Sequence, residues 1–290
     1  MRITTDMIKD LRDKTGAGMM DCKRALESTE GDMDAAVEFL RKKGAAVAQK
    51  RSDRSAKEGM IVTAVSGNGK RGIILEVNSE TDFVGRSDDF VGFAETVARI
   101  LQRERPGTIE ELLAAAAEDG KTVSALLNDL LAKVGEKIDI RRFKVVESDG
   151  GLVSSYTHLG SKIGVLVELT GVDASETGVS VGRDIAMQIA AMNPQVVARD
   201  QVEQKVIDQE LDIYRTQAAN EGKPAQVVDR IAAGRLEKFY QEVCLLEQTY
   251  IKDPGRTVKD FLREMGSAAG TTIAVRQFYR FHLGEEIAAT

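Results

Sequence analysis

The sequence predicts an α+β protein with a duplicated hairpin-plus-helix core, a small helical bundle before that core, and an inserted antiparallel helical hairpin. Three patterns carry this prediction: short β-branched runs bounded by glycine, a segment that recurs 92 residues further along the chain, and a later stretch with coiled-coil spacing. The 290 residues, of which 42% are hydrophobic, are enough for two domains. We expect parts at residues 1–52, 53–149 and 150–290, with the helical hairpin at 201–245.

Residues 1–52 show the pattern of three short helices. The first begins behind a Thr5 cap and breaks at the glycine-rich loop 15–18, and the third covers residues 34–40. The apolar residues expected to face inward in the first two helices are Met7, Ile8, Leu11, Met19, Cys22 and Leu26. Three short helices with little else resemble a ubiquitin-associated-type bundle, which we expect to end near Gly44.

Met19 and Met20 directly follow the glycine-rich loop. Methionine side chains are flexible and apolar, so these two either fill the core of the bundle or present an adhesive surface. Helical spacing alone favours the core. From the residues themselves, both interpretations stay open.

One hairpin-plus-helix unit occurs twice. The glycines that open its strands, Gly59 and Gly72, return as Gly151 and Gly164, each 92 residues later. The register continues into the next helix, where the aligned residues are Phe93, Ala94, Val97 and Ala98 in the first copy and Ile185, Ala186, Ile189 and Ala190 in the second. The core therefore consists of two copies of one folding unit.

The two copies differ in the loop between strand and helix. Thr81-Asp82-Phe83-Val84 stands opposite residues 173–176, whose sequence is Asp-Ala-Ser-Glu. A lone aromatic residue in a loop most often folds back into the core. A residue that the unit needs for folding, however, should appear in both copies. The acidic segment around Phe83 is therefore a candidate functional site.

Several shorter signals complete the core. Residues 67–72 read Gly-x-Gly-x-x-Gly, but they open a strand rather than a helix, so we expect a hairpin turn and not a dinucleotide site. Thr108 begins a capping box, and Thr122 caps a helix that stops at Gly135. In the strand that follows, the apolar alternation slips by one residue, which a bulge at 141–142 would correct.

From Val202 onward the pattern changes to long helices. Apolar residues keep coiled-coil spacing on both sides of a turn at 220–224, which predicts the antiparallel hairpin. We expect Asp253-Pro254-Gly255 to end the hairpin, followed by a helix over 258–265 and a strand of alternating residues over 273–283.

Composition excludes several classes of function. A net charge of −6 argues against nucleic-acid binding as the main role, and the basic segment 41–57 is explained more simply as a solvated helix end and linker than as an RNA contact. Cys22 and Cys244 are too few for a disulfide framework, and His158 and His282 add no standard zinc spacing. With no signal peptide and no run of the ~18 apolar residues that span a bilayer, we expect a cytosolic protein without membrane contact.

Two motifs resemble bacterial elongation factor Ts. They are the segment from Asn78 to Val84, and the N-terminal Leu11-Arg12 with the run from Thr15 to Lys23. The likeness extends over 135–169 and the Gly222-Lys223-Pro224 turn, and so over nearly the whole chain. The resemblance implies a guanine-nucleotide exchange factor that binds GDP-bound and nucleotide-free elongation factor Tu, without a cofactor and without chemistry of its own.

The resemblance also implies which residues contact that partner. Thr81, Asp82, Phe83 and Val84 correspond to the loop that dislodges Mg²⁺ from elongation factor Tu. Further contacts correspond to Leu11, Met19, Met20 and His158. Some family members dimerise through the helical hairpin, and the sequence leaves open whether this chain does.

Two other functions compete with this interpretation. An adaptor would use the N-terminal bundle to recruit partners without changing them. A metal-dependent hydrolase would use the acidic residues Glu80, Asp82, Asp88 and Asp89, although their spacing is not that of an EF-hand. The sequence contains no nucleophile elbow and no P-loop, which disfavours an enzyme.

Overall fold

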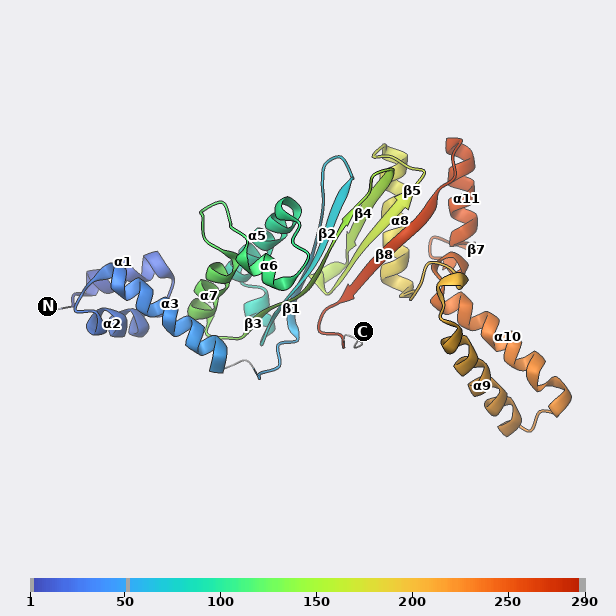
Figure 1. Ribbon diagram of the computed structural model, residues 1–290, viewed down its shortest axis with the longest axis horizontal. Coiled ribbons are helices and arrows are strands. Elements are labelled where there is room, and N and C mark those ends of the chain that lie inside the picture. The colour runs from blue at the N-terminus through green and yellow to red at the C-terminus, as the bar shows by residue number, and fades with distance from the viewer. Residues whose placement is uncertain (1–2, 51–52, 287–290) are drawn as a thin grey trace.

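The computed structural model describes residues 3–50 and 53–286. The described chain is elongated, with the N-terminal bundle at one end, two β-sheets in the middle and a helical hairpin that projects at the other end (Figure 1). Helices and strands are both abundant, so the α+β class is confirmed. The boundary expected at residue 52 and part of the basic segment lie outside the described residues. None of the described helices is both long enough and apolar enough to cross a membrane.

Three helices form the bundle: α1 (Thr5–Thr15), α2 (Met19–Ser28) and α3 (Met33–Lys50). The cap of α1 is Thr4 rather than the expected Thr5, because the Thr4 hydroxyl accepts the hydrogen bond from the Met7 amide (3.3 Å). Cys22 is buried, as predicted, and burial raises the pKa of its thiol. The buried core of the bundle consists of Leu11, Ala17, Cys22, Ala25, Leu26, Ala36 and Leu40.

Helix α3 is longer than the sequence predicted. It continues past Gly44, which was expected to end the bundle. Gly44 instead allows α3 to pack closely against the core helix α7 (Val123–Val134), because a Cβ at this position would lie 2.9 Å from the backbone oxygen of Asn128. A glycine in a helix is read as a stop signal from sequence, and here packing between helices overrides that signal.

The first copy of the unit forms a three-stranded antiparallel sheet in the order β1-β2-β3. The turn at 67–72 joins the first two strands as predicted, with the Ser66 amide donating to the Arg71 carbonyl (2.8 Å). Helices α5 and α7 bury their apolar faces on one side of this sheet. The elements are β1 (Glu58–Val65), β2 (Arg71–Ser79), α5 (Asp88–Glu104) and β3 (Ile138–Glu147).

The second copy forms a sheet in the order β4-β5-β8, covered by α8 and α11. The segment 253–255, expected to end the helical hairpin, lies instead in a short strand that pairs with the strand before it, and the second helix of the hairpin already ends at Val243. The elements are β4 (Gly151–Thr157), β5 (Ile163–Thr170), α8 (Glu176–Met192), β6 (Thr249–Tyr250), β7 (Asp253–Thr257), α11 (Val258–Ala269) and β8 (Ala274–His282).

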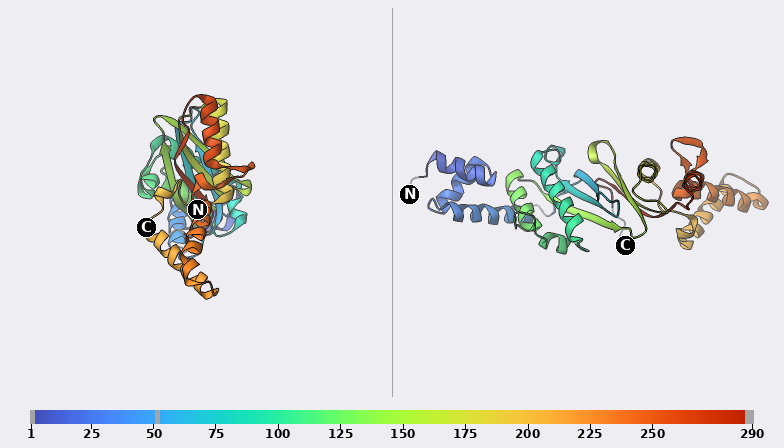
Figure 2. Two further views of the ribbon diagram at one scale, coloured as in Figure 1. Left: turned by 90° about the vertical axis from the view of Figure 1, so that its right-hand side faces the viewer. Right: turned by 90° about the horizontal axis from the view of Figure 1, so that it is seen from above.

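The two sheets pack against each other through the faces that their helices do not cover. Helices therefore lie on both outer sides of the pair of sheets (Figure 2). The Val153 amide donates to the Gly69 carbonyl (2.7 Å), and the Lys70 ammonium donates to the Gly151 carbonyl (2.7 Å). The middle strands β2 and β5 are therefore buried on both faces, which explains their continuous apolar sequence. The shared apolar layer contains Ile61, Ile74, Val146, Val153, Leu166, Phe281 and Leu283.

The bulge predicted in β3 is present. Glu76 pairs with Arg142 while Val77 pairs with Ile140, so Arg141 is the extra residue. An equivalent shift occurs in the second sheet between β5 and β8. Both third strands are thus bent at the same place in the repeated unit.

Each bulge lies opposite a buried glutamate of the middle strand. Glu76 accepts hydrogen bonds from Arg141 (3.0 Å), Arg142 (2.6 Å) and the Gly284 amide (2.9 Å). Burial raises the pKa of Glu76, but the Gly284 amide and the two guanidinium groups outweigh burial and hold the pKa below its usual value. Glu168, at the matching position, is also buried and accepts from two side chains of β8 (3.2 and 2.8 Å).

The helices inserted in the first copy are α6 (Ile109–Ala114) and α7. Thr108 caps α6 through the Glu111 amide (3.2 Å), but the predicted capping box is incomplete because the Glu111 carboxylate accepts from the Gly107 amide (2.6 Å) instead. Thr122 caps α7, and α7 ends at Gly135 (φ 70°), both as predicted.

The helical hairpin consists of α9 (Gln204–Asn220) and α10 (Ala225–Val243), within the predicted range 201–245. At its base, Arg199 donates to Glu237 of α10 (2.6 Å) and to Glu247 after the hairpin (2.6 Å). This ion-pair cluster ties the hairpin to the segments on both sides of it. Three single 3₁₀ turns complete the described chain: η1 (Leu159–Ser161), η2 (Arg199–Gln201) and η3 (Leu245–Glu247).

Candidate functional site

The loop that differs between the two copies folds into a separate one-turn helix, α4 (Asp82–Gly85). Thr81 caps this turn, because its hydroxyl accepts from the Val84 amide (3.4 Å). In the second copy, the matching residues 174–177 lead straight into the continuous helix α8. In the first copy, residues 86–87 separate α4 from α5. The sequence difference therefore corresponds to a broken helix.

Neighbouring residues hold the α4 turn in place. The Thr81 amide and hydroxyl donate to the Glu136 carboxylate (3.0 and 2.9 Å), and the Ser79 hydroxyl donates to the Thr81 carbonyl (2.8 Å). The Glu80 carboxylate accepts from the Lys137 amide (2.7 Å). No sequence pattern signals the bonds to Glu136 and Lys137, since they join segments that are more than 50 residues apart along the chain.

The far end of α4 packs on β1. A Cβ at Gly85 would lie 3.0 Å from the Cα of Gly59, whose φ of 125° favours glycine. Val84 is partly buried against the first apolar core, and Arg54 pairs with Glu80 (3.0 Å) on the other side. The backbone on both sides of Phe83 is thus fixed by contacts with the core.

Phe83 itself points into solvent, with 85% of its surface exposed. The interpretation of Phe83 as a core residue is therefore wrong. Asp82 pairs with Arg86 (3.2 Å) at the surface, an arrangement that contributes little to stability. The α4 turn thus presents an aromatic ring and a carboxylate on adjacent residues at the surface, outside the apolar cores.

His158 lies in the hairpin loop between β4 and β5 and is exposed. Its Nδ1 is 3.0 Å from the Tyr156 hydroxyl, and its amide donates to the Ile163 carbonyl (2.9 Å). The loop then turns through Gly160 (φ 79°). The imidazole is thus oriented by Tyr156 and remains accessible.

The His158 loop and α4 lie at the same end of the two sheets. Lys162, at the end of the His158 loop, pairs with Glu58 (3.7 Å), and Glu58 is opposite Ser79 in the β1-β2 register. Ser79 in turn bonds to Thr81, the cap of α4. Residues from both copies of the unit can therefore contact one partner at this end.

In the bundle, Met20 is 63% exposed and Met19 is 38% exposed. The surface interpretation of these two methionines therefore replaces the core interpretation that spacing favoured. The prediction that Leu11 adds to this surface is wrong: its side chain is fully buried, because the inward face of α1 packs it in the bundle core. Phe39 is 39% exposed and was not singled out from the sequence.

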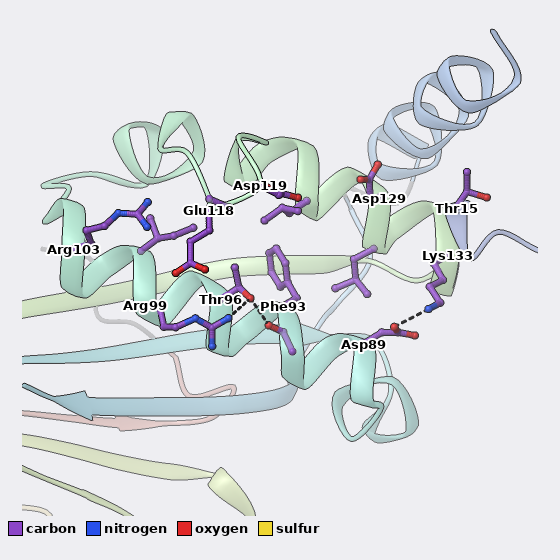
Figure 3. A pocket seen from close by; sticks show the side chains of 15 residues that line it. Thr15, Asp89, Phe93, Thr96, Arg99, Arg103, Glu118, Asp119, Asp129 and Lys133 are labelled. Atoms are coloured by element: carbon purple, nitrogen blue, oxygen red, sulfur yellow. Dashed lines mark hydrogen bonds and ion pairs between the residues drawn. The ribbon is translucent and has the colours of Figure 1, made fainter. Parts of the chain in front are cut away.

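A cavity of about 420 Å³ lies between α5, α7 and the loop before α7 (Figure 3). Charges of both signs surround it, and Lys133 pairs with Asp89 (2.6 Å) at one side. None of the predicted contact residues lines this cavity. Over residues 3–50 and 53–286, no group of three or more His, Cys, Asp or Glu side chains is arranged to hold a metal ion.

Comparison with known proteins shows which family the chain belongs to. The family model described as Elongation factor TS matches residues 80–285. Elongation factor Ts of Trichlorobacter lovleyi is 46% identical over 291 residues, which cover 98% of this chain and 94% of that protein. The Clostridium perfringens protein of the same name is 46% identical over 285 residues, with 98% and 94% covered, and that of Chloroherpeton thalassium is 47% identical over 287 residues, with 98% and 99% covered. The chain belongs to the elongation factor Ts family.

Proposed function

We propose that this chain is a cytosolic guanine-nucleotide exchange factor for elongation factor Tu, and that α4 is the part that enters the partner. The observation that carries the proposal is the 85% exposed side chain of Phe83 on a turn whose backbone is held from several sides. Thr81, Asp82 and Val84 complete the segment. Phe83 would fill an apolar crevice beside the Mg²⁺ site of elongation factor Tu, and Asp82 would disturb the groups that hold the water ligands of the ion.

Displacing Mg²⁺ is enough to loosen GDP. The ion neutralises phosphate charge and is held largely through water and a few ligands, so a competing carboxylate weakens the whole arrangement. The factor needs no bond-making chemistry, because exchange follows from linkage. A protein that binds the nucleotide-free partner more tightly than the GDP-bound partner lowers the affinity for GDP by the same factor, and nucleotide then expels the protein.

The other parts of the chain supply binding in this proposal. Residues 1–52, which we take to be a ubiquitin-associated-like domain, dock through Met19 and Met20. Residues 53–149 carry α4, and residues 150–290 carry His158 near the phosphate-binding loop of the partner. Association of two copies through the helical hairpin stays a prediction.

Release of labelled GDP from elongation factor Tu tests the proposal. A small amount of this protein should accelerate release of GDP from an excess of the partner, because each molecule acts repeatedly. An adaptor would bind elongation factor Tu without changing the rate. Binding without acceleration would therefore contradict the exchange function, and metal-dependent hydrolysis by the chain alone would favour the enzyme alternative.

A further inference from the structure

The α4 turn cannot hold its position through helix formation alone. It has four residues, Asp82–Gly85, and helices shorter than about 12 residues are marginal in water because nucleation is unfavourable. Phe83 adds little packing to the rest of the chain, since 85% of it is exposed. The direction in which Phe83 points is therefore set by contacts of the residues beside it.

Those neighbouring residues form a reciprocal pair of contacts with the segment after α7. The Glu136 carboxylate accepts from the amide and the hydroxyl of Thr81 (3.0 and 2.9 Å). In the opposite sense, the Glu80 carboxylate accepts from the amide of Lys137 (2.7 Å). The adjacent residues Glu80 and Thr81 thus form hydrogen bonds with the adjacent residues Glu136 and Lys137, with one carboxylate acceptor on each side. Hydrogen bonds to ionised carboxylates are among the stronger ones in proteins.

We propose that Glu136 is a positioning residue of the exchange site. It fixes Thr81, and through Thr81 it sets the direction in which Phe83 is presented to the partner. Glu136 itself does not need to touch elongation factor Tu. The inference rests on the function proposed for α4, and it adds a residue that the comparison of the two copies does not reveal.

The segment that carries Glu136 is well placed for this role. It begins at Gly135, which ends α7 in the left-handed conformation (φ 70°). Helix α7 is anchored by Leu130 and Leu131 in the first apolar core and also packs against α3 of the bundle. The carboxylate that holds the α4 cap is therefore attached to the packed interior rather than to a free loop.

The test measures GDP release from elongation factor Tu at increasing concentrations of wild type, Glu136→Ala and Glu136→Gln. We expect Glu136→Ala to lower the maximal rate about tenfold, which corresponds to ~1.4 kcal/mol and is the scale of a hydrogen bond to a charged group. The half-saturating concentration should change less, because the Met19 and Met20 surface is untouched. Glu136→Gln keeps an acceptor oxygen and should recover part of the rate.

Glu118→Ala serves as the matched control, since it removes an exposed carboxylate from another loop. It should exchange at the wild-type rate. Melting followed by circular dichroism checks that every variant is folded at the assay temperature. If Glu136→Ala is unfolded there, Glu136→Gln carries the test, with a smaller loss of maximal rate expected and a wild-type maximal rate as the contradicting result.

A double-mutant cycle with Phe83→Ala separates positioning from a general structural effect. If Glu136 acts through Phe83, its substitution slows exchange in the wild-type background but adds little once residue 83 is alanine. Equal losses in both backgrounds would overturn the proposal, as would an unchanged maximal rate for Glu136→Ala beside an active wild type. A wild type that fails to accelerate GDP release would overturn the proposed function, and the positioning role with it.

Discussion

At the scale of single residues, exposure separates the side chains available for binding from those that hold the fold. Burying a Phe or Met side chain is worth ~1.5–3 kcal/mol, and only a side chain exposed in the free protein can release that energy on binding. Phe83 and Met20 are 85% and 63% exposed, whereas Leu11 is fully buried. Leu11 therefore stabilises the bundle and has no exposed surface to offer a partner.

Replacing both Met19 and Met20 by serine should weaken association and leave the maximal exchange rate nearly intact. The reason is that these side chains add apolar contact area away from the α4 turn. The exposed parts of Met19 (38%) and Met20 (63%) together amount to about one side chain, so we expect a loss of ~1.5–3 kcal/mol and a rise of about ten- to a hundredfold in the half-saturating concentration in the GDP-release assay.

The control for this variant is Leu11→Ala, which removes a buried side chain and should destabilise the bundle by ~2–5 kcal/mol. Circular dichroism distinguishes the two cases. A methionine double variant that unfolds like Leu11→Ala would show that Met19 and Met20 belong to the core.

At the scale of elements, a bulge lies opposite a buried glutamate in each sheet, and Glu76 in the first sheet makes stability depend on pH. The pKa of Glu76 is lowered in the folded state. Its contribution is therefore present above the unfolded pKa of about 4.3 and is lost as the pH falls through the folded pKa. Glu76→Gln should cost about 1–3 kcal/mol at neutral pH, because two partly exposed arginines each lose one of their partners.

Urea unfolding at a series of pH values measures this effect. Below about pH 4.3, the unfolding free energy of the wild type should fall more steeply than that of Glu76→Gln, and the difference between the two should shrink. Other carboxylates are common to both proteins and cancel in the comparison. Parallel curves over the whole range would show that the Glu76 network does not contribute in this way.

The hairpin of α9 and α10 is a second element with a separate test. It projects from the core, and its own buried residues include Ala218, Ala232 and Tyr240 (Figure 1). Replacing residues 201–241 with a short linker should leave a folded factor with reduced exchange, because the replaced segment excludes Leu245, which is buried in the second core. An insoluble product, or a soluble one without any exchange activity, would mean that the core depends on the hairpin.

The sequence revealed the duplicated core because close backbone contacts require glycine at equivalent positions of both copies, 92 residues apart. A Cβ at Gly59 would lie 2.1 Å from the Val77 oxygen, and a Cβ at Gly151 would lie 1.8 Å from the Leu169 oxygen. Glycine is therefore required in both copies. The contact of Glu136 with Thr81 leaves no such pattern, because it joins a side chain to a segment 55 residues away.

Burial in the bundle was the harder part to predict. Helical spacing placed Met19 inside, but its helix begins at that residue, directly after Gly18, where a side chain has fewer neighbours to cover it. The same spacing correctly placed Cys22 and Leu26 further along the helix. Periodicity thus identified the inward face of the helix and failed at its exposed first turn.

At the scale of the whole molecule, the bundle and the α4 turn share one support. Helix α3 of the bundle packs on α7, and the segment after α7 carries Glu136, which bonds to Thr81. The bundle lies at one end of the elongated chain and the sheets lie next to it (Figure 1). Docking of the bundle would therefore also place α4 on the partner.

The proposed displacement of Mg²⁺ predicts a dependence on free Mg²⁺. Raising its concentration should slow GDP release by the wild type, because the ion and the α4 turn compete for the same state of elongation factor Tu. The Asp82→Asn variant should accelerate GDP release less than the wild type does, and its rate should depend less on the Mg²⁺ concentration. The reason is that the amide lacks the charge that disturbs the metal site. An Asp82→Asn variant with the wild-type Mg²⁺ response would contradict this role of the carboxylate.

The most direct test compares the maximal rate of GDP release from elongation factor Tu with wild type, Phe83→Ala and Val179→Ala, a control that trims an exposed apolar residue of the second copy. Losing the ~1.5–3 kcal/mol of one buried Phe at the partner should slow exchange by roughly one to two decades, at ~1.4 kcal/mol per tenfold. Thermal stability should stay unchanged, whereas loss of a core Phe would cost ~3–5 kcal/mol. A Phe83→Ala variant that melts early and, once folded, exchanges at the wild-type rate would contradict the account.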